Sequence, residues 1–276
     1  MSRERFYELM GRKKALIGMI HLGALPGTPK QRLTLAQVAA QAVDEARLLA
    51  EAGFDALILE NMHDAPYLKG EVGPEIIAAM TAITAQVAAA VDVPLGVQVL
   101  AAANRGALAV ALASGAQFIR AEGFVFSAVA DEGLLETADA GPLLRYRRAI
   151  GAKHIQVWAD IKKKHSAHAL TGDVDLAETA HAAEFFGADG LIVTGTSTGK
   201  PTAQRDVATA RASSDLPILV GSGVKPESLE ALWQHADGLI VGSWYKEGGH
   251  WANGPDPARV RALVEAAKGA RPGDGG

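Results

Sequence analysis

Short apolar runs alternate along the chain with longer, alanine-rich segments in which apolar residues recur at helical spacing. The short runs are typical of strands that are buried on both faces. Alternation of strands and helices predicts repeated β-α-β units around a parallel sheet. The predicted strands are Leu16–His21, Ala56–Glu60, Leu95–Val99, Phe118–Ala121, Ile155–Ile161, Gly190–Val193, Ile218–Val220 and Gly238–Val241.

Each predicted strand is followed by one predicted helix. Several of these helices end at a glycine, such as Gly53, Gly115 and Gly187, a residue that adopts the left-handed conformation of a helix C-cap at little cost. Eight strand–helix pairs predict the α/β class and a single (β/α)8 TIM barrel rather than an open sheet. The predicted helices are Leu35–Ala52, Pro74–Val91, Arg105–Ser114, Pro142–Ile150, Asp175–Phe186, Thr202–Ala212, Pro226–His235 and Asp256–Lys268.

No linker or break in composition divides the chain, so we expect one domain over residues 1–268 and a disordered, glycine-rich tail over 269–276. The 276 residues, 49% of them hydrophobic, suit a barrel of about 250 residues. A net charge of -4 argues against nucleic acid as a partner, because nucleic-acid binding favours a basic face. Homo-oligomerisation is left open.

The chain contains no cysteine, which excludes disulfides, thiolate catalysis and cysteine-ligated zinc. This composition fits a reducing compartment, and we expect a cytoplasmic protein. No run approaches the roughly 18 apolar residues that a membrane helix requires, so no transmembrane segment is predicted.

Two glycine-serine turns follow the last two predicted strands. Gly221-Ser222-Gly223 follows the seventh strand, and Gly242-Ser243 follows the eighth. Phosphate groups in barrels often bind at this position, where glycine lets the backbone approach an anion closely. The alternative is a pair of ordinary turns, but their joint position favours a phosphate site.

Polar residues stand at or just beyond the ends of the apolar strands, where a barrel opens. His21, Glu60, Asp160 and Lys162 are the candidate acid–base groups, because such a mixture can shift pKa values as proton transfer requires. The candidate substrate-binding residues are Asn61, Gln98, Arg120, Glu122, Lys164, Thr194, Gly221, Ser222, Gly223, Gly242 and Ser243.

Each of these side chains also has a structural alternative. His21 could be a core histidine, and Glu60 could form an ion pair with Arg120 that only closes the barrel. The lysines from Lys162 to Lys164 could be a solvated run. Their position directly after the fifth strand favours contact of one lysine with an anionic substrate.

The sequence assigns no cofactor. A divalent metal ion could be held by His63, Asp64, His165 and His168 with Glu60 or Asp160, but their spacing matches no metal-binding motif. FMN could place its phosphate at the glycine-serine turns, yet no residue marks a site for its ring system.

Seven longer motifs span nearly the whole chain: Gly18–Gly27, Glu60–Pro66, Phe118–Arg120, Asp131–Gly133, Leu144–Arg147, Ala159–His165 and Val220–Val224. Together these motifs resemble the BtpA family. The resemblance implies an α/β barrel of poorly defined activity, and the family name reflects a role in photosystem I accumulation. One difference lies at Gln98-Val99-Leu100-Ala101-Ala102-Ala103, where many relatives carry arginine and aspartate, which argues against an identical substrate.

Two functions follow from these observations. The first is an enzyme, a lyase, isomerase or hydrolase, that acts by acid–base chemistry on a small phosphorylated metabolite such as a sugar or nucleoside phosphate. The second is a non-catalytic assembly or regulatory factor that retains an anion-binding barrel. We also expect the long segment from Gly123 to Asp139, with aromatic Phe124 and Phe126, to fold over the barrel mouth as a lid.

Overall fold

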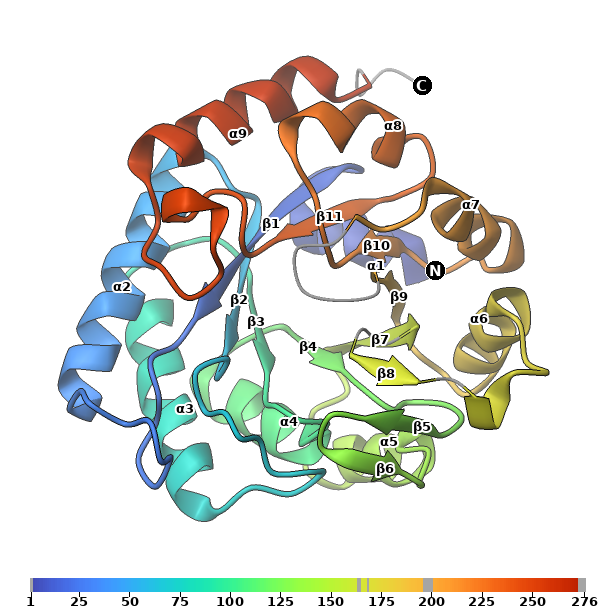
Figure 1. The fold of residues 1–276 in the computed structure, drawn as a ribbon, viewed down its shortest axis with the longest axis horizontal. Coiled ribbons are helices and arrows are strands. Elements are labelled where there is room, and N and C mark those ends of the chain that lie inside the picture. Colours follow the sequence, from blue (N-terminus) through green and yellow to red (C-terminus); the bar gives the residue numbers. More distant parts are fainter. Residues whose placement is uncertain (1, 163–164, 168, 196–200, 273–276) are drawn as a thin grey trace.

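The computed structural model describes residues 2–162, 165–167, 169–195 and 201–272, and it forms a closed barrel of parallel strands (Figure 1). The strand order around the barrel is β1-β11-β10-β9-β7-β4-β3-β2, so neighbours in the chain are neighbours in space. The predicted (β/α)8 barrel is confirmed. The barrel strands are β1 (Ala15–His21), β2 (Ala56–Glu60), β3 (Leu95–Gln98), β4 (Phe118–Ala121), β7 (Gln156–Lys162), β9 (Gly190–Val193), β10 (Ile218–Val220) and β11 (Gly238–Val241).

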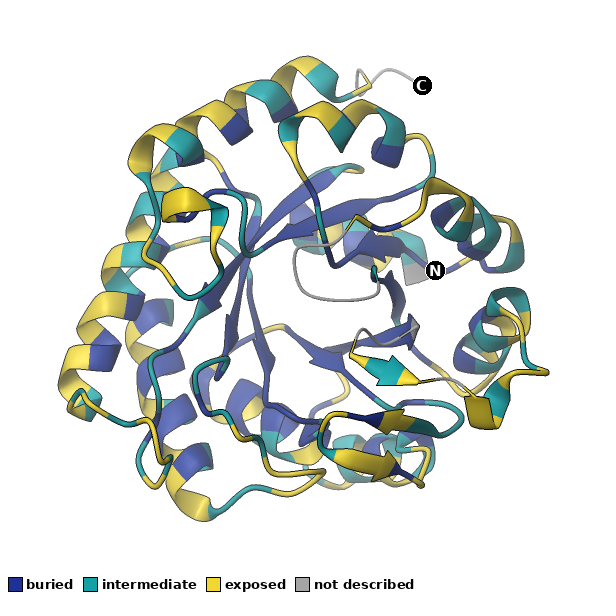
Figure 2. Ribbon diagram, in the orientation of Figure 1, coloured by how far each residue is buried: buried dark blue, intermediate teal, exposed yellow. Residues whose placement is uncertain are grey.

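Helices surround the barrel, with their buried faces toward the strands and their exposed faces toward solvent (Figure 2). The first of them begins at a capping box between Thr34 and Gln37 and ends at Gly53, whose φ of 110° is left-handed. The last reaches Ala270, two residues past the predicted domain end. The helices are α2 (Leu35–Ala52), α3 (Pro74–Ala88), α4 (Asn104–Ser114), α5 (Ala140–Ala149), α6 (Leu176–Phe185), α7 (Gln204–Ser213), α8 (Leu229–Trp233) and α9 (Pro257–Ala270), with 3-10 turns at Ala169–Thr171, Pro226–Ser228 and Glu247–Gly249.

Alternation along the strands divides the core into two layers. Residues that point outward pack against the helices, and residues that point inward fill the barrel. In the inner layer, the rings of Phe118 and Trp158 stack with centroids 3.8 Å apart. The barrel is therefore a packed core that supports a site only at its end.

An additional helix, α1 (Ser2–Met10), closes the end of the barrel opposite the mouth and lies behind the strands in Figure 1. Its Phe6 and Met10 are buried in the inner layer, and the Phe6 ring lies 5.5 Å from that of Trp158. Gln156 donates a hydrogen bond to the carbonyl oxygen of Arg5 at 3.1 Å. The sequence did not predict this helix, because its mean composition is polar and its apolar positions are few.

The segment from Gly123 to Asp139 contains a second sheet that was not predicted. The short strand β5 (Ala128–Ala130) pairs on one side with β6 (Gly133–Leu135) and on the other with β8 (Ser166–Ala167). Phe124 is fully buried, and the sheet lies beside the barrel opening in Figure 1. Closure of this segment as a lid stays a prediction. None of the helices in the described residues is long and apolar enough to cross a membrane.

Candidate functional site at the barrel mouth

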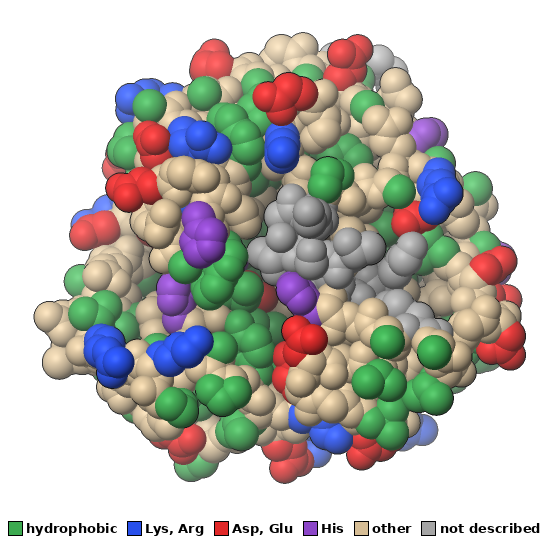
Figure 3. All heavy atoms as spheres, viewed as in Figure 1, with side chains coloured by type: hydrophobic (Ala, Val, Ile, Leu, Met, Phe, Trp, Pro, Cys, Tyr) green, Lys and Arg blue, Asp and Glu red, His purple; other side chains and the backbone are tan. Residues whose placement is uncertain are grey.

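Five of the predicted polar residues point inward at or just beyond the ends of their strands. Each of these stands two positions after a residue of the inner core, as His21 does after Met19 and Glu60 after Ile58; the others are Arg120, Asp160 and Thr194. The strand register pairs His21 with Glu60 and Glu60 with Gln98. Because side chains alternate between the two faces of a strand, these polar side chains point inward and meet at one end of the barrel. The acidic and basic side chains of the same face are interspersed around the rim (Figure 3).

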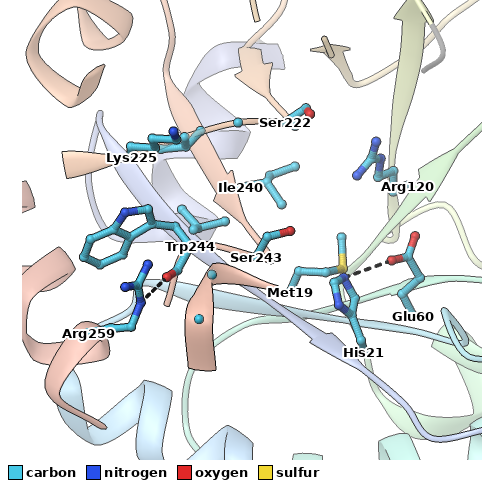
Figure 4. A pocket seen from close by; sticks show the side chains of 17 residues that line it. Met19, His21, Glu60, Arg120, Ser222, Lys225, Ile240, Ser243, Trp244 and Arg259 are labelled. Atoms are coloured by element: carbon cyan, nitrogen blue, oxygen red, sulfur yellow. Dashed lines mark hydrogen bonds and ion pairs between the residues drawn. The ribbon is translucent and has the colours of Figure 1, made fainter. Parts of the chain in front are cut away.

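A cavity of about 310 Å³ opens at this end (Figure 4). Figure 4 shows His21, Glu60 and Arg120 on one side of it, with Ser222 and Ser243, which follow strands β10 and β11, beside them. The cavity joins the predicted proton-transfer groups to the predicted phosphate corner. The predicted site residues that line it are His21, Glu60, Arg120, Gly221, Ser222, Gly223, Gly242 and Ser243.

Crowding inside the barrel explains two of the glycines. A Cβ atom on Gly221 would lie 2.8 Å from Cγ2 of Ile192 and 3.3 Å from Nη2 of Arg120. A Cβ atom on Gly242 would lie 3.1 Å from Nε2 of His21. Both turns therefore bring bare backbone against the charged side chains of the mouth.

His21 and Glu60 form a close contact between an imidazole and a carboxylate. The Nδ1 atom of His21 lies 3.0 Å from the carbonyl oxygen of Trp251, and a carbonyl only accepts, so Nδ1 carries hydrogen. The Nε2 atom lies 3.4 Å from Oε2 of Glu60. Without a proton, both of these atoms are acceptors. The contact therefore favours one proton between them, either on the imidazolium or on the carboxylic acid.

Arg120 is held by Asp160 in a buried ion pair. The Nε atom of Arg120 lies 3.2 Å from Asp160 Oδ2, its Nη2 atom lies 3.1 Å from the same oxygen, and both side chains are 1% exposed. Burial acts to lower the pKa of Arg120, but Asp160, Glu60 and Glu122 together raise that pKa above its usual value. Arg120 is therefore a fixed cation in the cavity wall. The expected alternative, an Arg120–Glu60 pair closing the barrel, is not the main contact.

Five predicted residues lie near the mouth but do not line the cavity. The Oδ1 atom of Asn61 accepts a hydrogen bond from the Leu100 backbone at 2.7 Å, and its Nδ2 atom donates to Asp64 at 2.8 Å, so this side chain supports a loop. The carboxylate of Glu122 accepts a hydrogen bond from the Ala102 backbone at 2.9 Å. The residues of this group are Asn61, Gln98, Glu122, Asp160 and Thr194.

The predicted contact of Lys162 or Lys164 with an anionic substrate remains a prediction. Lys162 is the last residue of β7, where the register shifts after Asp160. Lys164 lies outside the described residues, as does His168. Within the part of the chain that the structure describes, no three His, Asp or Glu side chains are placed to hold a metal ion.

The structure adds cavity residues that the sequence reasoning missed. Lys225 follows the first glycine-serine turn, Trp244 follows the second, and Arg259 comes from the first turn of α9. A basic residue in the first turn of a helix is unfavourable because it opposes the helix dipole. This unusual position could have marked Arg259 as a functional residue from the sequence.

Comparison with known proteins agrees with the motifs. A family model described as "BtpA family" matches residues 12–269. An uncharacterized mitochondrial protein of Caenorhabditis elegans is 43% identical over 264 residues, which cover 94% of this chain and 95% of that protein. The photosystem I biogenesis protein BtpA of Synechocystis sp. is 36% identical over 252 residues, which cover 91% of this chain and 87% of that protein.

A solved structure supports the fold. Thiamine phosphate pyrophosphorylase from Pyrococcus furiosus has a TM-score of 0.56 and 13% identity, with 93% of this chain and 96% of that chain covered. At this identity the likeness shows a shared barrel and nothing about chemistry. Family model and relatives together span nearly the whole chain, and the protein belongs to the BtpA family.

Proposed function

We propose that this protein is an enzyme that acts by acid–base chemistry on a small phosphorylated metabolite. The observation that carries the proposal is the single cavity lined both by the His21–Glu60 pair and by the glycine-serine turns. Its volume of about 310 Å³ suits a ligand the size of a sugar phosphate. The reaction is a lyase, isomerase or hydrolase reaction.

In this proposal the two turns bind the phosphate. Backbone N–H groups after strands β10 and β11 and the hydroxyls of Ser222 and Ser243 are its donors. The carbonyl oxygen of Ser222 accepts a hydrogen bond from Thr202 Oγ1 at 3.0 Å, which fixes the first turn. Preformed donors bind an anion without a further ordering cost.

The reacting part of the ligand then lies over His21, Glu60 and Arg120. The His21–Glu60 pair gives or takes a proton, since either member can hold it. Arg120 stabilises negative charge that develops on a substrate oxygen. Asp160 acts by holding Arg120, while Lys162, Asn61, Gln98, Glu122, Lys164 and Thr194 remain candidates for contacts to the rest of the ligand.

The test begins with mass spectrometry of small molecules that stay bound on purification, followed by turnover assays with the compound identified. Glu60→Gln conserves volume and removes the proton acceptor, so turnover is expected to fall by about a hundredfold or more with binding retained. Glu230→Gln, an exposed position on α8, is the control and should leave turnover unchanged. Equal turnover of Glu60→Gln and wild type would contradict the proposal.

A non-catalytic assembly or regulatory factor is the second candidate, and the name of the Synechocystis relative favours it. This function predicts a bound phosphorylated ligand that is never converted. Isotope-labelled ligand recovered unchanged after long incubation, together with a partner protein retained only in the liganded state, would support it. The cytoplasmic location stays a prediction, because the Caenorhabditis elegans relative is described as mitochondrial.

A further inference from the structure

The outer end of the cavity carries two cations that no part of the proposed acid–base chemistry uses. Figure 4 shows Lys225, Trp244 and Arg259 together on the side of the cavity away from His21 and Glu60. Within the residues that the structure describes, neither Lys225 nor Arg259 forms an ion pair. Charged side chains that line a cavity without a counterion call for a charged ligand.

We propose that Lys225 and Arg259 select a ligand group with two negative charges, the terminal dianion of a phosphate monoester. This inference rests on the proposed function and narrows its substrate class. It excludes carboxylates and phosphodiesters, which carry one charge, as the group bound at this end.

The contacts of Arg259 hold its guanidinium in place for a ligand. Its Nε atom donates to the carbonyl oxygen of Trp244 at 2.7 Å, and its guanidinium lies 4.4 Å from the centre of the Trp244 ring. These contacts fix the plane of the guanidinium, which leaves its terminal nitrogens to form the paired hydrogen bonds that phosphate accepts.

The turn opposite Arg259 leaves room for this arrangement. Gly248 and Gly249 are both left-handed, with φ of 63° and 69°. A Cβ atom on Gly249 would lie 3.3 Å from Nη2 of Arg259. A larger residue here would press on the guanidinium and would be strained in its backbone.

The start of helix α9 does not supply the positive charge. The side chain of Asp256 caps it and accepts hydrogen bonds from the backbone of Ala258 at 2.8 Å and of Arg259 at 3.3 Å. The acidic cap already occupies these donors, so an anion at this end depends on side chains.

The inner charges of the site largely cancel. Arg120 is paired with Asp160, and His21 is paired with Glu60. Among the charged side chains that line the cavity, Lys225 and Arg259 remain, and their two positive charges match a dianion. A monoanion at this position would leave one cation without a partner.

The experiment measures binding of two small probes to the full-length protein by calorimetry. Methyl phosphate is mostly a dianion above about pH 6, whereas dimethyl phosphate carries a single charge. Wild type should bind methyl phosphate at least about tenfold more tightly. Lys225→Gln and Arg259→Gln should each weaken methyl phosphate binding by about tenfold or more, the effect of losing one charge-assisted hydrogen bond. Arg261→Gln, an exposed position on the same helix, is the matched control.

The outcomes separate this inference from the proposed function. Gly223→Asp places a carboxylate in the turn and should abolish binding of both probes. Suppose that Gly223→Asp abolishes binding but the double variant Lys225→Gln/Arg259→Gln still prefers methyl phosphate as wild type does. The selection of a dianion by these two cations is then wrong, while phosphate binding at the glycine-serine turns is supported. If Gly223→Asp binds methyl phosphate as wild type does, or wild type binds neither probe, both are wrong. Melting temperatures of the unliganded variants verify folding.

Discussion

Asp160→Asn should destabilise the protein strongly, even though it nearly conserves volume. Asp160 and Arg120 are each 1% exposed in their side chains, and their atoms approach to 3.1 Å. Removing one charge of a buried pair costs about 3–5 kcal/mol, because the remaining charge stays buried without its partner. At about 2–4 °C per kcal/mol for a chain of this size, the melting temperature should fall by roughly 10 °C.

Two further variants show whether the stability loss of Asp160→Asn comes from the buried charge. Glu265→Gln breaks the exposed ion pair with Lys268, whose side chains are 71% and 60% exposed, and should change stability by less than about 1 kcal/mol. Arg120→Met/Asp160→Leu removes both charges and should recover much of the stability, since an apolar pair has no desolvation cost. Circular dichroism melting curves measure all three. An unchanged melting temperature for Asp160→Asn would refute the reasoning and leave only a chemical role for this carboxylate.

Three other changes test the packing and the titration of the barrel. Phe6→Ala should cost about 3–5 kcal/mol in chemical unfolding, because Phe6 is fully buried against Trp158; a loss below about 1 kcal/mol would contradict a packed plug. Gly221→Ala should cost about 1–3 kcal/mol and weaken phosphate binding, because its Cβ would lie 2.8 Å from Ile192; unchanged melting and affinity would contradict this. Burial, followed by Lys246, lowers the pKa of His63, so stability should fall as pH drops through 6.5, where the unfolded chain binds the proton first. The loss should be smaller in His63→Gln, and equal pH curves would contradict the assignment.

The positions of the mouth residues were predictable because strand periodicity is a local property. The pattern of Leu57-Ile58-Leu59-Glu60 predicts both a strand and the polar residue at its end. Once eight such runs close into a barrel, their last inward residues must meet. The same reasoning failed for α1, whose burial depends on the open end of the barrel rather than on its own pattern.

The ion-pair partners were not evident from the residues taken singly. Glu60 lies on β2 and Arg120 on β4, with β3 between them, whereas β7 is the direct neighbour of β4. The register pairs Arg120 with Trp158, so Asp160 lies diagonally across, within reach of a long side chain. Strand order thus decides which of two acids holds the arginine.

The segment between β11 and α9 connects the two ends of the site. Trp244 at its start holds Arg259, and Trp251 further along holds Nδ1 of His21. The protonation of His21 and the position of the outer cation therefore depend on one stretch of backbone. Sequence periodicity says little about such a segment, because apart from one 3-10 turn and one bridge it has no regular secondary structure.

That segment is anchored from within the fold. The hydroxyl of Tyr245 donates to the carbonyl oxygen of Met19 at 2.6 Å, and Nζ of Lys246 lies 2.7 Å from Oε1 of Glu45 on α2. Burial raises the pKa of Glu45, and the charge of Lys246 opposes that rise. Because a buried charge is stable only with its partner, the ion pair holds the segment against the barrel. The geometry of both ends of the cavity thus rests on Tyr245, Lys246 and Glu45, which do not line it.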